Sequence, residues 1–257
     1  MTLLAADIVE RFYTFLWPMM RIGAMMMAAP LFALDSITLR LRVVITLVLS
    51  VLIYPLITWP VIDPVSAEGL LEIVNQLFIG ALMGLMLQVV TGALVLAGSS
   101  IASSMGLSMA SMIDPNIGNV PVLSQFLVIL STLVFLGFGG HVIIISIVLD
   151  SFRVLPVGQS LMGQVPYGKV IAWSSMMFLG GLLVALPVMV SLLFINIGLG
   201  VVTRAAPSLN IFSVGFPATI AAGFIVLIIS LESIIGRMQW LWMQGFAHVR
   251  DLLGLVS

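Results

Sequence analysis

The feature that most constrains this sequence is a set of long stretches without a charged residue. They lie between Glu72 and Asp114, between Asp114 and Asp150, and between Lys169 and Arg204. About 20 apolar residues in a helix cross the hydrocarbon core of a bilayer. Each stretch is longer than that, so the sequence predicts a membrane-embedded, all-α chain whose helices are longer than ordinary spans.

The composition excludes several other classes of protein. Charged residues make up 7% of the chain and hydrophobic residues 61%, whereas soluble domains carry about 25% charge. A net charge of -1 leaves no basic face for nucleic acid. The chain has no Cys, and we find neither a phosphate-binding GxxxxGK[ST] motif nor a His/Asp/Glu cluster with metal spacing. No cofactor, metal or enzymatic activity is therefore expected.

Apolar runs alternate with polar or proline-rich turns along the chain. They cover residues 12–34, 43–62, 73–113, 122–149, 170–203 and from 211 almost to the C-terminus. The first two predict a helical hairpin and the last two a second, longer hairpin. Pro187 is expected to kink the fifth run, and Pro217 is expected inside the last helix.

Small and polar residues in the third run indicate close contacts with protein. Gly80 and Gly84 form a GxxxG spacing, which lets another helix backbone approach closely. Residues 98–106 contain four serines and are too polar to face lipid, so we expect protein to cover them. The basic residues of the short loops give contradictory orientations. Helices packed against other subunits would explain both observations.

Several single residues have two readings. Arg21 lies inside an apolar run, where a charge is costly unless paired; it either meets another subunit or extends toward a membrane surface. Asp114 either titrates in a proton pathway or, as the sequence favours, forms a turn before Pro115. Ser108 and His141 suggest an intramembrane protease, but Ser108 lacks the flanking glycines that a nucleophile on a strained turn requires, so we disfavour it.

Methionine is used unusually. Met25, Met26 and Met27 are consecutive, while Met105, Met109 and Met112 precede a loop rich in Pro and Gly. Methionine side chains are flexible enough to close around objects of varying shape, although they also fill gaps between helices. Taken alone, gap filling is the favoured interpretation of these residues.

Segments spread over nearly the whole chain resemble the FliR family of the bacterial flagellar type III export gate, with relatives in injectisomes. In chain order these segments are LWPMMR at 16–21 with Ala29-Pro30, QLFIG at 76–80, MGLSMA at 105–110 with Asp114-Pro115, Gly140-His141, DSF at 150–152 with LPVG at 155–158, NIGLG at 196–200, RAAP at 204–207 and GFP at 215–217. Ser99 and Ser104 depart from the residues common in relatives.

This resemblance implies a fold, partners and a site. The fold would be a FliP-like part (1–169) fused to a FliQ-like long helical hairpin (170–257). The chain would assemble with FliP, FliQ and FlhB family subunits in the inner membrane at the flagellar basal body, and would pass unfolded export substrates. A plug at about 106–122 would close the pore, through Met105, Gly106, Met109, Met112, Ile113, Asp114, Pro115, Gly118 and Pro121. Contacts with other subunits are expected at Arg21, Gly80, Gly84, Arg204 and Pro217.

The predicted function is therefore a non-enzymatic subunit that forms and plugs a protein-conducting channel. Two alternatives remain open: the equivalent subunit of a virulence injectisome, and a secondary transporter with broken helices around a mid-membrane site. A transporter predicts an internal repeat and a titratable or substrate-binding cluster, and we find neither in the sequence.

Overall fold

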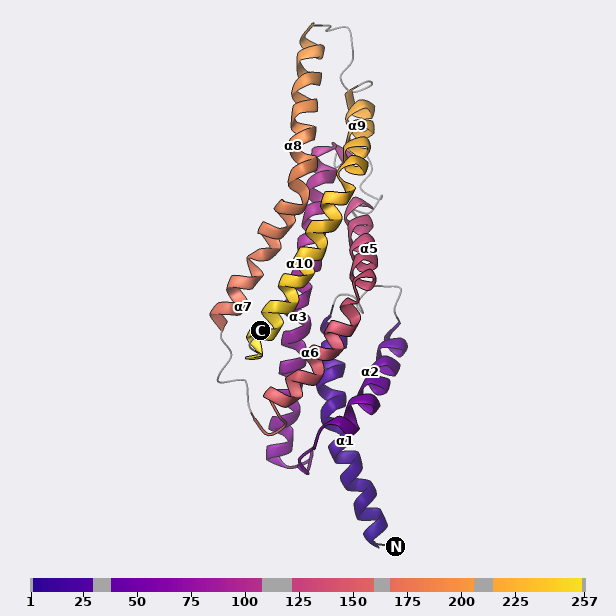
Figure 1. Ribbon diagram of the computed structural model, residues 1–257, viewed down its shortest axis with the longest axis vertical. Coiled ribbons are helices and arrows are strands. Elements are labelled where there is room, and N and C mark those ends of the chain that lie inside the picture. The colour runs from indigo at the N-terminus through magenta and orange to yellow at the C-terminus, as the bar shows by residue number, and fades with distance from the viewer. Residues whose placement is uncertain (1, 30–37, 108–121, 160–166, 206–214, 256–257) are drawn as a thin grey trace. The chain divides into compact units, whose positions relative to one another are not determined.

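A computed structural model of the chain (Figure 1) describes residues 2–29, 38–107, 122–159, 167–205 and 215–255. Within these ranges every regular element is a helix, which agrees with the predicted all-α membrane fold. The helices are α1 (Thr2–Ala28), α2 (Leu39–Ile53), the short 3₁₀ turn η1 (Tyr54–Leu56), α3 (Ala67–Ser104), α5 (Val122–Gly137), α6 (Gly140–Val154), α7 (Tyr167–Ser174), α8 (Met176–Ala205), α9 (Phe216–Ile229) and α10 (Leu231–Leu252).

The helices group into two compact units that interleave along the sequence. Unit 1 contains Met1–Val89, Gly139–Ser174 and Gln244–Ser257, and unit 2 contains Val90–Phe138 and Ser175–Met243. Both α3 and α10 contribute residues to each unit. The predicted boundary between residues 169 and 170 rests on a resemblance to two kinds of subunit. A division into compact units does not test such a resemblance, so the boundary stays a prediction.

The predicted N-terminal hairpin is confirmed within unit 1. Helices α1 and α2 pack on each other. The hydroxyls of Thr14 and Tyr54 are 2.8 Å apart, and a Cβ on Gly23 would lie 3.5 Å from the Thr46 side chain. Later residues of α1 thus meet earlier residues of α2, which makes the pair antiparallel.

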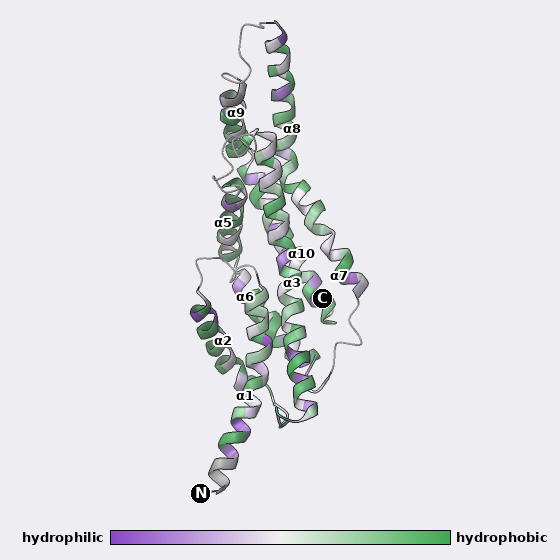
Figure 2. Ribbon diagram, turned by 180° about the vertical axis from the view of Figure 1, so that it is seen from behind, coloured by the Kyte–Doolittle hydropathy of each residue, from purple (hydrophilic) through white to green (hydrophobic). Residues whose placement is uncertain are grey.

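Two helices are long enough to exceed a bilayer. α3 has 38 residues and α8 has 30, which at 1.5 Å per residue gives roughly 57 Å and 45 Å, against a hydrocarbon core of about 30 Å. In the part of the chain that the structure describes, three helices are long and apolar enough to cross a membrane, or up to five spans if each bent pair counts as one. Green, hydrophobic residues dominate these helices in Figure 2.

Two of the predicted continuous helices are broken. The run 122–149 is divided into α5 and α6, and Gly139 at the break has φ of 76°. The C-terminal run bends by 62° between α9 and α10, at Ser230. Pro217 also differs from its predicted place, because it lies in the first turn of α9, where its missing N–H removes no helical hydrogen bond.

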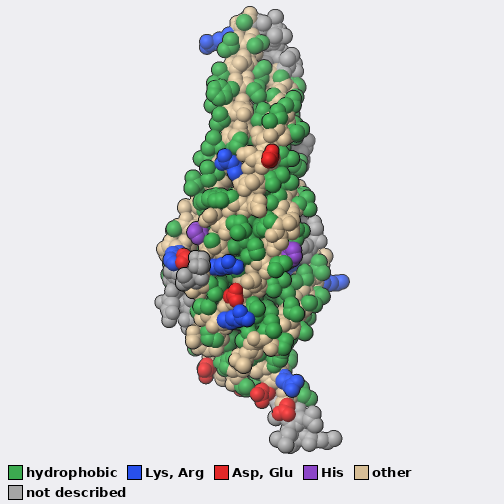
Figure 3. Space-filling view, viewed as in Figure 1, with side chains coloured by type: hydrophobic (Ala, Val, Ile, Leu, Met, Phe, Trp, Pro, Cys, Tyr) green, Lys and Arg blue, Asp and Glu red, His purple; other side chains and the backbone are tan. Residues whose placement is uncertain are grey.

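Green, hydrophobic side chains are spread over the whole length of the face shown in Figure 3, with scattered charges among them. The exposed ones include, along α2, Val43, Val44, Leu47, Val48, Val51 and Leu52, and along α8, Phe178, Leu179, Leu182, Leu193, Phe194 and Ile197. Contiguous apolar surface of this kind marks a membrane or protein interface. Lipid or other subunits must therefore cover these helices.

Candidate functional site

Arg21 is the centre of a buried polar cluster in unit 1. Its side chain is fully buried. Nε donates to Gln76 Oε1 at 2.7 Å, Nη1 to the Ser151 carbonyl at 2.8 Å and its hydroxyl at 3.2 Å, and Nη2 to the Leu155 carbonyl at 2.8 Å. The guanidinium carbon lies 4.1 Å from the centre of the Phe152 ring, a cation–π distance. Every nitrogen of the guanidinium thus has an acceptor.

The charge of Arg21 is linked to a buried acid through one amide. Gln76 accepts from Arg21 and donates through Nε2 to Glu72 Oε1. Glu72 is only 6% exposed. Asn75, on the same helix, donates to the Gln159 carbonyl at 2.8 Å. Burying a charge is costly unless polar groups replace its water, and these contacts give both the guanidinium and the carboxylate polar partners.

These contacts satisfy Arg21 within its own chain, and its contact with another subunit stays a prediction. Its hydrogen-bond partners come from α3, α6 and the residue after α6 of its own chain, so neither an inter-subunit partner nor a membrane surface is needed to satisfy it. The sequence resemblance also gains a physical reason. Gln76 and Ser151, which are 55 and 130 residues away from Arg21 along the chain, lie in two of the matching motifs and both accept from its guanidinium.

Gly80 and Gly84 bring α3 against α1. A Cβ on Gly80 would overlap the Arg21 carbonyl oxygen, and a Cβ on Gly84 would lie 2.5 Å from Ala28 Cβ and 2.8 Å from Ala29 N. The predicted close approach of a second helix is confirmed. The approaching helix belongs to the same chain, and contact of these glycines with another subunit stays a prediction.

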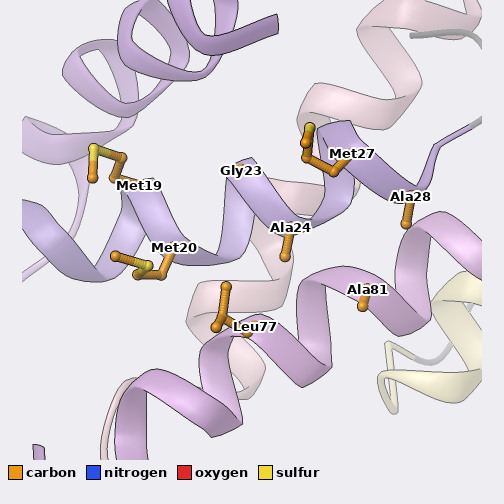
Figure 4. A pocket seen from close by; sticks show the side chains of 8 residues that line it. All are labelled: Met19, Met20, Gly23, Ala24, Met27, Ala28, Leu77 and Ala81. Atoms are coloured by element: carbon orange, nitrogen blue, oxygen red, sulfur yellow. The ribbon is translucent and has the colours of Figure 1, made fainter. Parts of the chain in front are cut away.

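An apolar groove runs beside this junction of α1 and α3 (Figure 4). Its lining consists of Met19, Met20, Gly23, Ala24, Met27, Ala28, Leu77 and Ala81. Of the three consecutive methionines, Met25 and Met26 are buried, whereas Met27 is 52% exposed. Gap filling therefore describes the first two, while Met27 lines an open surface.

Most of the predicted plug lies outside the described residues. This holds for Met109, Met112, Ile113, Asp114, Pro115, Gly118 and Pro121, and also for Ser108. The structure describes the residues on each side of this segment, beginning with Met105 and Gly106. Their contacts show how the ends of residues 108–121, here called the central segment, are attached to unit 2.

The upstream end of the central segment is held by Met105 and Gly106. Met105 is fully buried, and a Cβ on Gly223 of α9 would lie 2.6 Å from Met105 Cγ. Met105 thus packs against α9, and its expected role in the plug stays a prediction. Gly106 ends α3 with φ of 79° and donates its N–H to the Ser103 carbonyl at 3.0 Å, the left-handed helix terminus that glycine favours.

The downstream end is held against α3. The Ser124 hydroxyl on α5 donates to the Val95 carbonyl at 2.9 Å. A Cβ on Gly98 would overlap the Ser124 backbone, so α3 and α5 touch at this point. The central segment therefore starts and ends at tightly packed positions of unit 2.

A serine-lined hollow occurs on the exposed side of α3 in unit 2. It is formed by Ser99, Ser100, Ser103, Ser104 and Met189. The Ser99 and Ser104 hydroxyls donate to the carbonyls of Leu96 and Ser100 on their own helix. Ser103 is exposed, so the chain itself does not fully supply the protein cover that the sequence predicted for this stretch.

The remaining predicted positions lie at helix ends. Arg204, in the last turn of α8, and Pro217, in the first turn of α9, are both exposed. They flank residues 206–214, which are outside the described part of the chain. His141 is exposed at the start of α6. None of these three belongs to the Arg21 cluster.

Sequence reasoning missed Glu72, Gln76 and Ser151 as members of a site. Gln76 and Ser151 appeared only as parts of matching motifs. Glu72 and Gln76 are four residues apart, the spacing that places two side chains on one helix face, and both interrupt an apolar context. That signal indicates a pair, but it does not identify Arg21 as their common partner.

Comparison with known proteins agrees with these motifs. Residues 12–245 match the family described as "Bacterial export proteins, family 1". Proteins named "Flagellar biosynthetic protein FliR" are similar: that of Pectobacterium carotovorum is 34% identical, covering 98% of this chain and 97% of the relative. Those of Escherichia coli K12 (31%; 93% and 92%) and Bacillus subtilis 168 (30%; 98% and 98%) are similar over comparable lengths. The chain therefore belongs to bacterial export protein family 1, the FliR family.

Proposed function

We propose that this chain is a non-enzymatic subunit of the flagellar type III protein export gate in the bacterial inner membrane. The observation that carries the proposal is the family match over residues 12–245, together with relatives named for flagellar biosynthesis that cover nearly the whole chain. The long apolar helices fit a membrane location.

Assembly with FliP, FliQ and FlhB family subunits is part of the proposal. α3 and α8 exceed the thickness of a bilayer, and the serine-lined hollow is polar on an otherwise apolar surface. Polar side chains on apolar helices are stabilised by hydrogen bonds to neighbouring helices. A partner helix over Ser100 and Ser103 would satisfy this requirement better than lipid. The FliP-like and FliQ-like division at residue 169 belongs to the same proposal.

The central segment is proposed to plug the conduit. The described residues on either side of it are held in unit 2 by the packing of Met105 and by the contact between Gly98 and Ser124. Met109 and Met112 would supply flexible apolar side chains that close around a substrate or around each other.

Deletion of the central segment tests this role. Residues 108–121 are replaced by a short Gly-Ser linker, which keeps Gly106 and Ser124 in place. We expect greater leakage of small ions across the inner membrane, measured with a membrane-potential dye, because the obstruction is removed. A Gly-Ser replacement of residues 206–214 serves as a control for loop replacement. Unchanged conductance in cells whose gate still assembles would contradict the plug assignment.

A further inference from the structure

Pro187 removes one hydrogen bond from the middle of α8. Proline has no N–H, so the carbonyl oxygen of Leu183, four residues earlier, loses its normal partner in the helix. The helix nevertheless runs as one element from Met176 to Ala205. In apolar surroundings an unpaired carbonyl is costly, and helices with internal proline depend on neighbouring groups to satisfy it.

The missing partner comes from α10. Arg237 Nη1 donates to the Leu183 carbonyl at 2.7 Å, the length of a strong, charge-assisted hydrogen bond. Leu183, Val184, Trp240 and Leu241 line the hollow in which Arg237 lies. A charge in such a setting needs a polar partner, and the carbonyl freed by Pro187 provides it. Arg237 thus satisfies the carbonyl that Pro187 leaves without a partner, and that carbonyl gives the charge of Arg237 its polar partner.

The packing around this hydrogen bond fixes its geometry. Gly180 lies about one turn before Leu183, and a Cβ there would be 2.7 Å from Leu241 Cδ2 on α10. Val184 is fully buried. The two helices are therefore held close together where Arg237 crosses to α8, and the guanidinium does not have to stretch to reach the carbonyl.

The helix is weakened on the other side of the proline as well. The Ser191 hydroxyl donates back to the Pro187 carbonyl at 2.9 Å, and serine hydroxyls bonded in this way often bend helices. Between Leu183 and Ser191, α8 therefore lacks one backbone hydrogen bond and has one carbonyl shared with a side chain. The hydrogen bond from Arg237 at this stretch can therefore influence the direction in which residues 188–205 continue.

We propose that Arg237 is a positioning residue that replaces the hydrogen bond removed by Pro187 and so fixes the direction of the C-terminal half of α8. The pair acts as one unit: Arg237 is required because residue 187 is proline. This inference goes beyond the export-gate assignment and does not depend on it, since it concerns how unit 2 keeps its shape.

Distances between spin labels along α8 test the proposal. The natural chain has no Cys, so labels can be attached uniquely to Phe178→Cys and Phe194→Cys, at exposed positions on either side of Pro187. Sixteen residues of straight helix separate the backbones by roughly 24 Å, within the range of double electron–electron resonance. The measurement uses the full-length chain in its purified membrane complex, beginning with the natural Pro187 and Arg237.

Four variants give the expected pattern. Arg237→Met should broaden the distance distribution about twofold or more, because the Leu183 carbonyl loses its donor. Pro187→Ala alone should leave the distance distribution narrow. Pro187→Ala combined with Arg237→Met should also give a narrow distribution, because alanine supplies an N–H to the Leu183 carbonyl. Arg237→Lys, which keeps a charged donor, should restore most of the narrow distribution.

Two matched controls separate the proposal from general destabilisation. Arg250→Met, in the last turn of the same helix, should leave the distribution unchanged. Pro18→Ala, the equivalent change in α1, should not rescue Arg237→Met. The proposal would be overturned if Arg237→Met left the distance distribution unchanged. It would also be overturned if Arg237→Met broadened the distribution equally whether residue 187 is proline or alanine. If Arg237→Met fails to accumulate, membrane abundance is the readout, and failure of Pro187→Ala to restore it would also overturn the proposal.

Discussion

At the scale of single residues, several polar side chains of this chain form hydrogen bonds with backbone carbonyls of neighbouring apolar helices. Arg21 occupies carbonyls at the end of α6 and reaches Glu72 through Gln76. Ser124 reaches across to a carbonyl of α3. Arg21 is the fully buried cation among the described residues, and because it is tied to particular acceptors, its removal should lower stability strongly.

Arg21→Met should destabilise unit 1 by about 3 kcal/mol or more, because removal of one partner leaves buried polar groups without a hydrogen bond. Arg21→Lys should be intermediate, since an ammonium cannot reproduce the planar fork of guanidinium. Thermal unfolding of the detergent-solubilised gate measures the loss. Arg11→Met, at an exposed position of the same helix, is the control. Equal melting temperatures for the two Met variants would refute this role of Arg21.

Gly106→Ala should cost about 1 kcal/mol, because a side chain is strained at the left-handed φ that ends α3. The change shifts the start of the central segment, so we expect raised ion leakage in addition to lower stability. Gly168→Ala in α7, where a Cβ meets no atom within 4 Å, should show neither effect. If ion leakage in Gly106→Ala stays at the wild-type level, the turn that ends α3 does not contribute to plugging.

At the scale of elements, close helix contacts were more predictable than helix breaks. The GxxxG spacing of Gly80 and Gly84 correctly indicated that a helix approaches α3 closely, since the absence of a side chain is a local property. The break at Gly139 was missed although three glycines lie within residues 137–140. Glycine permits a left-handed turn without requiring it, and packing decides whether the turn is used.

Gly80→Ala should reduce the amount of chain in purified membranes severalfold, because its Cβ would overlap the α1 backbone at Arg21. Gly198→Ala, in α8 and without any atom within 4 Å of the added Cβ, should be neutral or slightly stabilising, since alanine favours helix by about 1 kcal/mol over glycine. Quantitative immunoblotting compares the two. Equal abundance would show that α1 and α3 do not need this close contact.

At the scale of the whole molecule, the exposed surface is unsuited to water. Apolar side chains remain exposed along α2 and α8, α3 is longer than a bilayer requires, and the serine-lined hollow is not sealed by the chain. Lipid can cover the first surface, but it does not supply the hydrogen-bonding partners that the hollow favours.

The full-length chain should therefore co-purify from solubilised membranes with FliP and FliQ family subunits, at fixed ratios measurable by native mass spectrometry. Ser100→Leu combined with Ser103→Leu should weaken this co-purification, because leucine would fill the space proposed for a partner helix. Leu193→Ile on the exposed side of α8 is the control. A stable monomer from wild-type cells would contradict the proposed assembly.

The sequence by itself determined that this is an all-α membrane protein of an export family, because charge-free length, small-residue spacing and motif order are written along the chain. Only the tertiary structure showed which groups satisfy Arg21, why Arg237 lies beside a proline-freed carbonyl, and where the chain bends at Gly139 and Ser230. The contacts of Arg21 and Arg237 involve partners 50 or more residues away, and the bends depend on how the helices pack. Local sequence does not specify which distant carbonyl will accept from a given side chain.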